Sequence, residues 1–309
     1  MLRFLIRRLF TSLIVIFGVV TLVFGALRLA PGDPVESILG EEALEVDKAQ
    51  MRECLRLDKS VPEQYALFWG DVASGTFGEL CNERGVTVSD KLKANLPSTI
   101  ELALASMLVA LLIAFPLGIA ASLKPYSWID NTSAVVALLG ISIPNFWLGP
   151  MLLILFSLTL KALPNPGSSV TGLTALILPA ITLGSALSAK LTRMLRSSML
   201  EVLNQDFVRT ARAKGLRERT VILKHALRNA LMPVTTVLGM QLGALLTGAL
   251  IVEKVFARAG LGMLLLDGIE QRNYLIVQGC VLLIAFIYVF VNVITDIVYG
   301  LIDPRIRYD

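Results

Sequence analysis

The sequence has 309 residues, of which 55% are hydrophobic and only 17% are charged, and its formal net charge is +4. A soluble globular chain usually carries about a quarter of charged residues. Several apolar runs reach the roughly 20 residues that a helix needs to cross a bilayer. The composition therefore excludes an ordinary soluble domain and predicts an all-α integral membrane protein.

Six apolar runs predict six transmembrane helices, and the prolines inside several of them are tolerated in membrane helices. The first run follows Arg3, Arg7 and Arg8, as in a signal peptide, but it is longer than a typical h-region and no small-residue cleavage site precedes Pro31. We interpret it as an uncleaved anchor. The six predicted helices are Leu9–Ala30, Thr99–Leu123, Ser133–Leu160, Leu173–Met194, Leu231–Val252 and Tyr274–Ile302.

The loops between these helices differ sharply in charge. Pro31–Ser98 holds 13 acidic and 7 basic residues, whereas Arg193–Ala230 holds 9 basic and 3 acidic residues. Positive charge near membrane ends favours the cytoplasmic side, so both termini, including Arg305 and Arg307, are predicted to be cytoplasmic. The predicted order is residues 1–30 as a cytoplasmic tip and first helix, 31–98 as an external (periplasmic) cap, and 99–309 as a five-helix core, with a cytoplasmic loop at 195–233 between the fourth and fifth helices.

The external cap is predicted to contain two helices. The stretch "DKAQMRECLRLDKSVPEQYALFWGDVASGTFGE" indicates one helix to about Leu57 and a second from Pro62 to near Gly75. Cys54 and Cys81 are candidates for a disulfide, since an external compartment permits one, but spacing alone does not give their separation. Three cysteines and one histidine in the whole chain predict no metal site.

Four polar residues in the apolar runs are candidates to line a transport path: Asn145, Gln241, Thr247 and Asn292. Each side chain is equally suited to bond a neighbouring helix. Asp296 also lies within a run, where a proton path and a structural ion pair are both open; one lone carboxylate makes a poor relay, which favours the structural alternative.

The cytoplasmic loop contains "TARAKGLRERTVILKHALRNALMP", two short amphipathic segments that meet at Gly215. Leu200, Leu203, Phe207 and Ala211 recur at helical spacing before this glycine. Such segments either lie on an anionic membrane surface or form a knob for a soluble partner. The sequence has no Gly-x4-Gly-Lys-Ser/Thr phosphate-binding loop, so the chain has no evident means of hydrolysing ATP by itself.

The pattern "DFVRTARAKGL" followed by "LRNALMPV" resembles the cytoplasmic EAA loop of ABC-transporter permeases, and more narrowly that of dipeptide, oligopeptide and nickel import permeases. The resemblance covers nearly the whole chain. Further matching segments follow in the expected order: "MLRFLIRRL", "LAPGDP", "GTFGE", "LPSTIELALA", "GISIPNFWLG", "ILPAITLG", "RMLRSSMLEVL", "IVEKVF", "GLG" and "VNVITDIVYGLIDPRIR".

The resemblance implies a non-enzymatic half-pore in a bacterial inner membrane. It also implies a second, homologous permease as a heterodimer partner, two cytoplasmic ATPase subunits that hold ATP and Mg²⁺, an external solute-binding protein, and no nucleic acid. No metal or cofactor is expected on this chain. The residues that match the ATPase-coupling motif are Arg209, Thr210, Ala211, Arg212, Ala213, Lys214, Gly215 and Leu216, and Asn229, Ala230 and Pro233 close the loop.

Within this motif, the small Ala211 and Ala213 are expected to let the helix approach an ATPase closely. Arg209 replaces the first glutamate of the general pattern. A second departure is "RAGLG" in place of a tryptophan-proline-glycine-leucine-glycine motif. This segment is expected to form an external scoop with Glu253, Arg258, Gly260 and Gly262.

Peptides are the first predicted substrate class, and nickel or another metal chelate, or glutathione, is the alternative within the same family. A secondary transporter fits less well, because no internal repeat with matched broken helices is visible. A membrane-embedded enzyme would need a catalytic constellation at membrane depth, and the sequence does not offer one.

Overall fold

The computed structural model describes residues 2–40, 42–81, 83, 85–167 and 172–302, and within these it leaves out the side chains of residues 2–7, 9, 244, 246, 247 and 298–302. The regular secondary structure of this part of the chain is helical, and the helices are joined by turns and loops that contain one isolated bridge, between Glu79 and Thr87. Four of its helices are long and apolar enough to cross a membrane, or up to six if each of two bent pairs counts as one span. The predicted cytoplasmic Arg305 and Arg307 lie outside the described residues.

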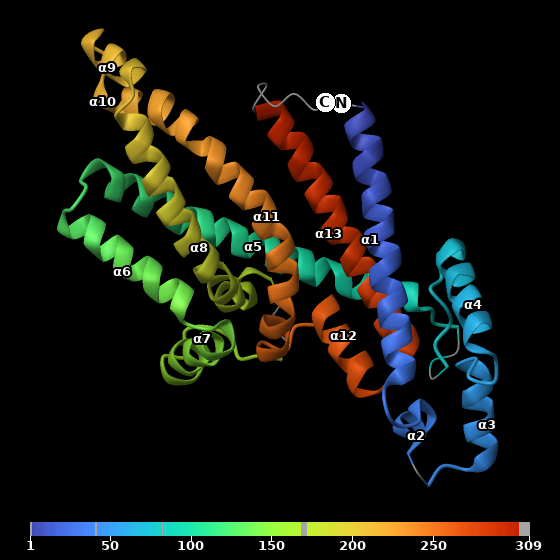
Figure 1. Ribbon diagram of the computed structural model, residues 1–309. Coiled ribbons are helices and arrows are strands. Elements are labelled where there is room, and N and C mark those ends of the chain that lie inside the picture. The colour runs from blue at the N-terminus through green and yellow to red at the C-terminus, as the bar shows by residue number, and fades with distance from the viewer. Residues whose placement is uncertain (1, 41, 82, 84, 168–171, 303–309) are drawn as a thin grey trace. The chain divides into compact units, whose positions relative to one another are not determined.

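The chain divides into two compact units. The first contains residues 2–99 and Arg258–Val289, and the second contains Ile100–Ala257 and residues 290–302. The helices of the first unit are α1 (Leu2–Leu29), α2 (Pro34–Leu39), α3 (Glu45–Cys54), α4 (Val61–Ser74), α12 (Leu261–Glu270), the start of α5 (Val88–Leu123) and most of α13 (Tyr274–Ile302) (Figure 1).

The second unit contains the rest of α5 and α13 together with the helices between them. These are α6 (Trp128–Ser142), α7 (Asn145–Leu152), the π-helix η1 (Leu153–Thr159), α8 (Leu173–Leu203), α9 (Asp206–Ala213), α10 (Glu218–Thr220), the π-helix η2 (Val221–Ala226) and α11 (Leu227–Val255).

Four of the predicted crossings are confirmed as single helices, with corrected ends: α1, α5, α8 and α13. α8 continues without a break through Pro179 and Lys190. α5 begins at Val88 rather than Thr99, so the helix extends into the segment that was predicted to be the cap.

The third predicted crossing is wrong as one helix. α6 and α7 meet at 104°, because Ile143 precedes Pro144 and adopts an extended conformation with φ −83° and ψ 117°. A proline ring disfavours helical geometry in the residue before it. The fifth predicted crossing, α11, is bent by 58° between Gly243 and Gly248.

The two predicted helices after α1 are present as α3 and α4. α4 begins at Ser60, whose N–H and hydroxyl donate to the Glu63 carboxylate at 3.0 and 2.8 Å, and these bonds hold the pKa of Glu63 below its ordinary value. Such a capping box satisfies backbone groups that the first helical turn leaves without partners. At the other end, Gly75 adopts φ +78°, the left-handed geometry in which glycine commonly ends a helix.

A disulfide joins Cys54, at the end of α3, to Cys81, with 5.9 Å between the Cα atoms. An ion pair between Arg56, just after α3, and Asp71 of α4 has a distance of 2.7 Å. The aromatic side chains of α4 pack on Phe24 of α1, so the segment after the first crossing is tied to that helix. Cross-linking and packing together make the first unit's small helices one ordered body.

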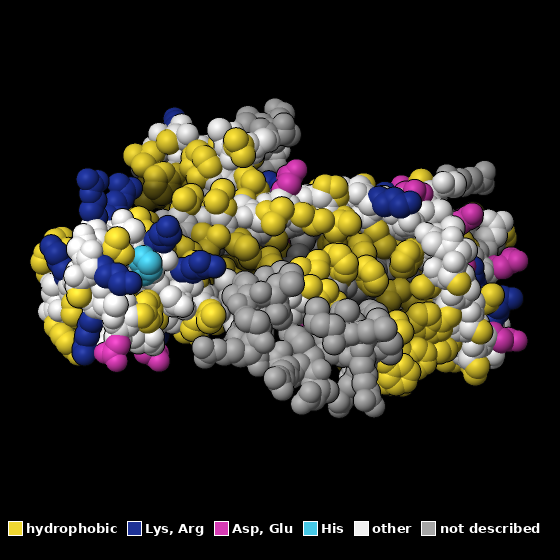
Figure 2. All heavy atoms as spheres, turned by 90° about the horizontal axis from the view of Figure 1, so that it is seen from above, with side chains coloured by type: hydrophobic (Ala, Val, Ile, Leu, Met, Phe, Trp, Pro, Cys, Tyr) yellow, Lys and Arg dark blue, Asp and Glu magenta, His cyan; other side chains and the backbone are white. Residues whose placement is uncertain are grey.

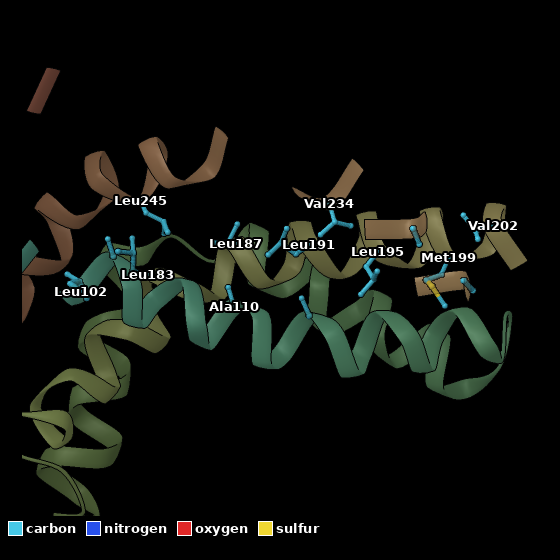
Figure 3. Close-up of a cluster of buried hydrophobic side chains, with 14 of the residues drawn as sticks. Leu102, Ala110, Leu183, Leu187, Leu191, Leu195, Met199, Val202, Val234 and Leu245 are labelled. Carbon is cyan, nitrogen blue, oxygen red and sulfur yellow. The ribbon is translucent and has the colours of Figure 1, made fainter. Parts of the chain in front are cut away.

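The core of the second unit forms around α8. Figure 3 shows side chains of α8 in a row between α5 and α11, and the residues of this row are Leu183, Leu187, Leu191, Leu195, Met199 and Val202. The spacing of three or four residues places them on one face of the helix. Leu102 and Ala110 of α5 and Val234 and Leu245 of α11 complete the layer.

Gly184 allows α8 to approach α5 closely. A Cβ atom at this position would lie 2.5 Å from the backbone carbonyl oxygen of Ser106, a group that cannot rotate away. A Cβ atom at Gly140 of α6 would lie 3.1 Å from the Ser185 carbonyl oxygen of α8, a tight contact that a small shift relieves. The close packing therefore requires a glycine at position 184 and favours one at position 140.

We expect Gly184→Ala to destabilise the protein by about 1–3 kcal/mol, the usual cost of overpacking a well-filled core. Two quantities are measured on the detergent-purified protein: its melting temperature and the fraction of the protein that remains monodisperse after heating. Gly25→Ala in α1 is the matched control, because a Cβ atom there meets nothing within 4 Å. Equal stability of the two variants would contradict the close approach of α8 and α5.

Candidate functional site

The chain between α8 and α11 folds into a compact elbow made of α9, α10 and η2, which lies at the tip of α8 and α11 in Figure 1. Gly215 forms the bend with φ +75°, and a Cβ atom there would meet nothing within 4 Å. The glycine is therefore favoured by its backbone conformation and not by crowding. Both the predicted hinge and the helix before it are present.

One face of the elbow is buried against the protein's own core. Val208 of α9 has no exposed surface and Ala211 is only 7% exposed, and both belong to the cluster that contains Met199 and Val202 of α8. Val221 of η2 completes the contact from the other side of the bend. The expectation that Ala211 faces a partner is therefore wrong: its small side chain lets α9 pack on α8 and η2.

The other face of the elbow is exposed, and its residues include seven of the eight predicted coupling positions: Arg209, Thr210, Arg212, Ala213, Lys214, Gly215 and Leu216. Phe207 and Leu216 are large apolar side chains that remain 38% and 40% exposed. Lys and Arg side chains gather with the one histidine on the left of Figure 2. The exposed face of the elbow thus presents apolar side chains that basic side chains surround.

Phe207 was not among the predicted coupling residues, because its spacing from Leu203 and Ala211 suggested one apolar face. The structure shows that α8 ends at Leu203 and a new helix begins at Asp206. The change of axis between them turns Phe207 outward. Asn204 and Gln205, which separate the helices, are the only local signal for this break in the sequence.

An ion pair closes the elbow across Gly215. Arg212 donates from Nη2 to Oε1 of Glu218 at 2.7 Å and from Nε to Oε2 at 3.2 Å. The guanidinium lowers the pKa of Glu218, and the carboxylate raises the pKa of Arg212. The pKa of Glu218 in the folded protein lies below its ordinary value. The pair therefore stabilises the elbow at pH values above the ordinary pKa of a glutamate. This contribution is lost as the pH falls through the lowered pKa.

The predicted loop-closing residues join η2 to α11. Asn229 donates from its side-chain amide to the carbonyl of His225 at 2.8 Å. Pro233 lies inside α11 and has no N–H to offer the Asn229 carbonyl four residues earlier. Ala230, between them, is fully buried in the core cluster. The motif therefore lacks one backbone hydrogen bond of the helix, at Pro233, and is held in the core cluster by Ala230.

The predicted path residues lie on three helices of the second unit, α7, α11 and α13. Gln241 accepts a hydrogen bond from Lys190 at 3.5 Å, while Asn145 on α7 and Asn292 on α13 are half-buried elsewhere in the same unit. The Thr247 side chain lies outside the described residues. Lining of a path by Asn145, Gln241, Thr247 and Asn292 stays a prediction.

The predicted external scoop is divided between the two units. Arg258 donates to the Ser98 hydroxyl at 3.3 Å, and the backbone N–H of Leu261 donates to the Thr99 hydroxyl at 2.8 Å. These bonds hold the segment with the buried Gly260 and Gly262 at the start of α12, a helix that was not predicted. Glu253 belongs to the other unit, where it is fully buried at the end of α11.

We expect Ala211→Leu to destabilise the protein by about 1–3 kcal/mol, because the added volume must enter a packed contact between α9 and α8. Ala213→Leu, two residues away on the exposed face, should leave stability within about 0.5 kcal/mol of the wild type. Thermal unfolding of the purified variants is the measurement. Similar losses for both variants would mean that the two faces of α9 are not distinct.

The chain matches known protein families and full-length relatives. Residues 114–308 match the family model described as binding-protein-dependent transport system inner membrane component, and residues 1–103 match the corresponding N-terminal model. The di/tripeptide transport system permease protein DppB of Pseudomonas aeruginosa is 41% identical over 335 residues, which cover 100% of this chain and 99% of that protein. The oligopeptide transport system permease protein AppB of Bacillus subtilis is 38% identical, with 100% of both chains covered.

Other relatives carry different transport names. The glutathione transport system permease protein GsiC of Salmonella choleraesuis is 39% identical over the whole of both chains. Among solved structures, an inward-facing MetNI methionine ABC transporter chain has a TM-score of 0.55 at 16% identity, with 69% of this chain and 96% of that chain covered. The structural likeness shows the fold alone. Taken with the two family models and the full-length relatives, it leads to one conclusion: the chain belongs to the family of binding-protein-dependent transport system inner membrane components, the membrane-spanning permeases of ABC transporters.

Proposed function

We propose that this permease forms half of the pore of a peptide importer and that the exposed face of its elbow docks a cytoplasmic ATPase subunit. The observation that carries the proposal is the elbow itself, which exposes Phe207 and Leu216 among basic side chains while Val208 and Ala211 anchor it in the core. Apolar anchors surrounded by charge are typical of specific protein–protein contacts.

The elbow is suited to carry force between a soluble subunit and the membrane. α9 packs on α8 and η2 continues into α11, so a push on the exposed face reaches two long helices directly. The bidentate pair between Arg212 and Glu218 keeps the bend from opening. A coupling segment needs this combination of an accessible surface and a stiff attachment.

The proposed assembly has the partners that this family implies. A second, homologous permease completes the pore as a heterodimer. Two ATPase subunits bind ATP and Mg²⁺ in the cytoplasm, and an external solute-binding protein delivers the substrate. Both termini of this chain are then cytoplasmic, and the segment that contains the disulfide is external, where oxidation of Cys54 and Cys81 is favoured.

Transport follows from alternation between two states of the pore. ATP binding closes the ATPase pair, closure moves the docked elbows, and the helices that carry them rock between inward-open and outward-open arrangements. The chain itself supplies no hydrolytic chemistry in this scheme. The chain transmits the displacement of α9 to α8 and α11, and the movement of these helices changes which side of the membrane the pore opens to.

Replacing both apolar anchors, as Phe207→Asp with Leu216→Asp, should release the ATPase subunits while the second permease stays bound. Loss of two apolar anchors that docking would bury should weaken docking at least tenfold. The measurement is co-purification with the tagged chain from its host membrane in mild detergent. Leu44→Asp is the control, since Leu44 is an exposed leucine that lies before α3, in the other unit of the chain.

The docking proposal fails if the wild type brings down no ATPase, or if the double variant retains it as well as the control does. The second result would favour an elbow that rests on anionic lipid, because a membrane-surface segment tolerates loss of a protein contact.

The substrate proposal rests on relatives whose names specify dipeptides, tripeptides or oligopeptides. Deleting the chain from its host should abolish ATP-dependent uptake of a labelled dipeptide, and excess unlabelled peptide should compete in the wild type. Glutathione and a nickel chelate should compete weakly or not at all. Intact dipeptide uptake in the deletion strain, with loss of glutathione or nickel uptake, would instead support one of those alternatives.

A further inference from the structure

A cavity of about 920 Å³ lies within the second unit, between α6, α8 and α11. Its volume is in the upper part of the range of small-molecule sites. The residues that matter for its chemistry are Asp130 and Leu138 of α6 and Lys190, Arg193 and Arg196 of α8.

The cavity wall has a surplus of positive charge. Three cationic side chains, Lys190, Arg193 and Arg196, face one carboxylate, Asp130, which leaves two positive charges. Asp130 is only 3% exposed and accepts from Nε and Nη2 of Arg196 at 2.5 and 2.6 Å. This bidentate pair fixes α6 against α8. Neither Lys190 nor Arg193 has a carboxylate within ion-pair distance among the described residues.

The position of Lys190 indicates that the cavity holds water. Lys190 lies well inside α8, one of the helices that are long and apolar enough to cross a membrane, and its side chain is exposed in this chain. An ammonium group at such depth is costly in lipid and usually faces a water-filled cavity. Among the described residues, Lys190 donates a hydrogen bond to the uncharged amide of Gln241, at 3.5 Å, which does not compensate its charge.

We infer that this cavity is a section of the substrate route and that Lys190 and Arg193 attract the carboxylate groups of peptides as they pass. The inference rests on the proposed peptide function and adds the residues that act inside the membrane. Every peptide with a free C-terminus carries a carboxylate, and acidic side chains add more. Lys190 and Arg193 are three residues apart, so both project from one face of α8.

The contact is suited to transit rather than retention. Both cations are exposed side chains beside water, where a pair with a carboxylate is weak and screened by salt. Leu138 and other apolar side chains line part of the wall, and the uncharged polar side chains that also line it are Tyr126, Asn131, Ser133, Thr192 and Ser197. Arg196 does not take part, since Asp130 already occupies its guanidinium.

The first test measures access and local charge without transport. In the complete transporter in membrane vesicles, Lys190→Cys should react with membrane-impermeant methanethiosulfonates. The rate of reaction with the anionic ethylsulfonate reagent, divided by the rate with the cationic ethyltrimethylammonium reagent, should fall about fivefold when Arg193→Gln is added. The background from this chain is low, since Cys280 is buried and the other two cysteines form a disulfide. Absence of reaction with both reagents would place Lys190 against lipid or protein and overturn the inference.

The second test measures which peptides lose transport. Lys190→Gln should lower the maximal uptake rate of acidic dipeptides about fivefold relative to that of basic dipeptides. Lys161→Gln is the matched control, because Lys161 is an exposed lysine in the segment between η1 and α8. Equal loss for acidic and basic peptides, or no loss, would overturn the inference. If the wild-type complex moves no peptide at all, the proposed function fails, whatever the thiol at position 190 shows.

Discussion

The second unit depends on how α8 packs against three other helices at once. Its row of leucines lies between α5 and α11, and backbone contacts at Gly184 and Gly140 bring α5 and α6 within reach. The same row continues through Met199 and Val202 into the contacts of the elbow. Because one apolar core holds both the membrane helices and α9, displacement of the elbow cannot be absorbed locally and must be shared by α8.

This arrangement gives α8 two distinct faces. Leucines occupy the face toward the core, whereas Lys190 and Arg193 project from the helix into the cavity beside α6. A helix that is apolar on both sides could only support its neighbours. Here the same element holds the unit together, sets the charge of the cavity wall and carries the elbow at its end, so mechanical and electrostatic roles are joined in one segment.

Long apolar runs were sufficient to predict most of the helices, because burial in lipid selects such runs directly. The break at Pro144 was missed, since prolines are tolerated inside some membrane helices and only the fold decides which ones interrupt the axis. The motif around Gly215 located the elbow, but two alanines of equal size gave no sign that Ala211 is buried and Ala213 exposed. Cys54 and Cys81 illustrate the same limit, because sequence separation does not report spatial separation.

The pair between Asp130 and Arg196 has a consequence for how this family can diverge. Asp130 is nearly inaccessible, so loss of Arg196 alone would leave a carboxylate buried without its counter-charge, whereas replacing both residues by apolar ones would remove the penalty altogether. Selection should therefore act on the two positions as a unit. Across related permeases, substitutions at these positions, 66 residues apart, should appear together and rarely singly.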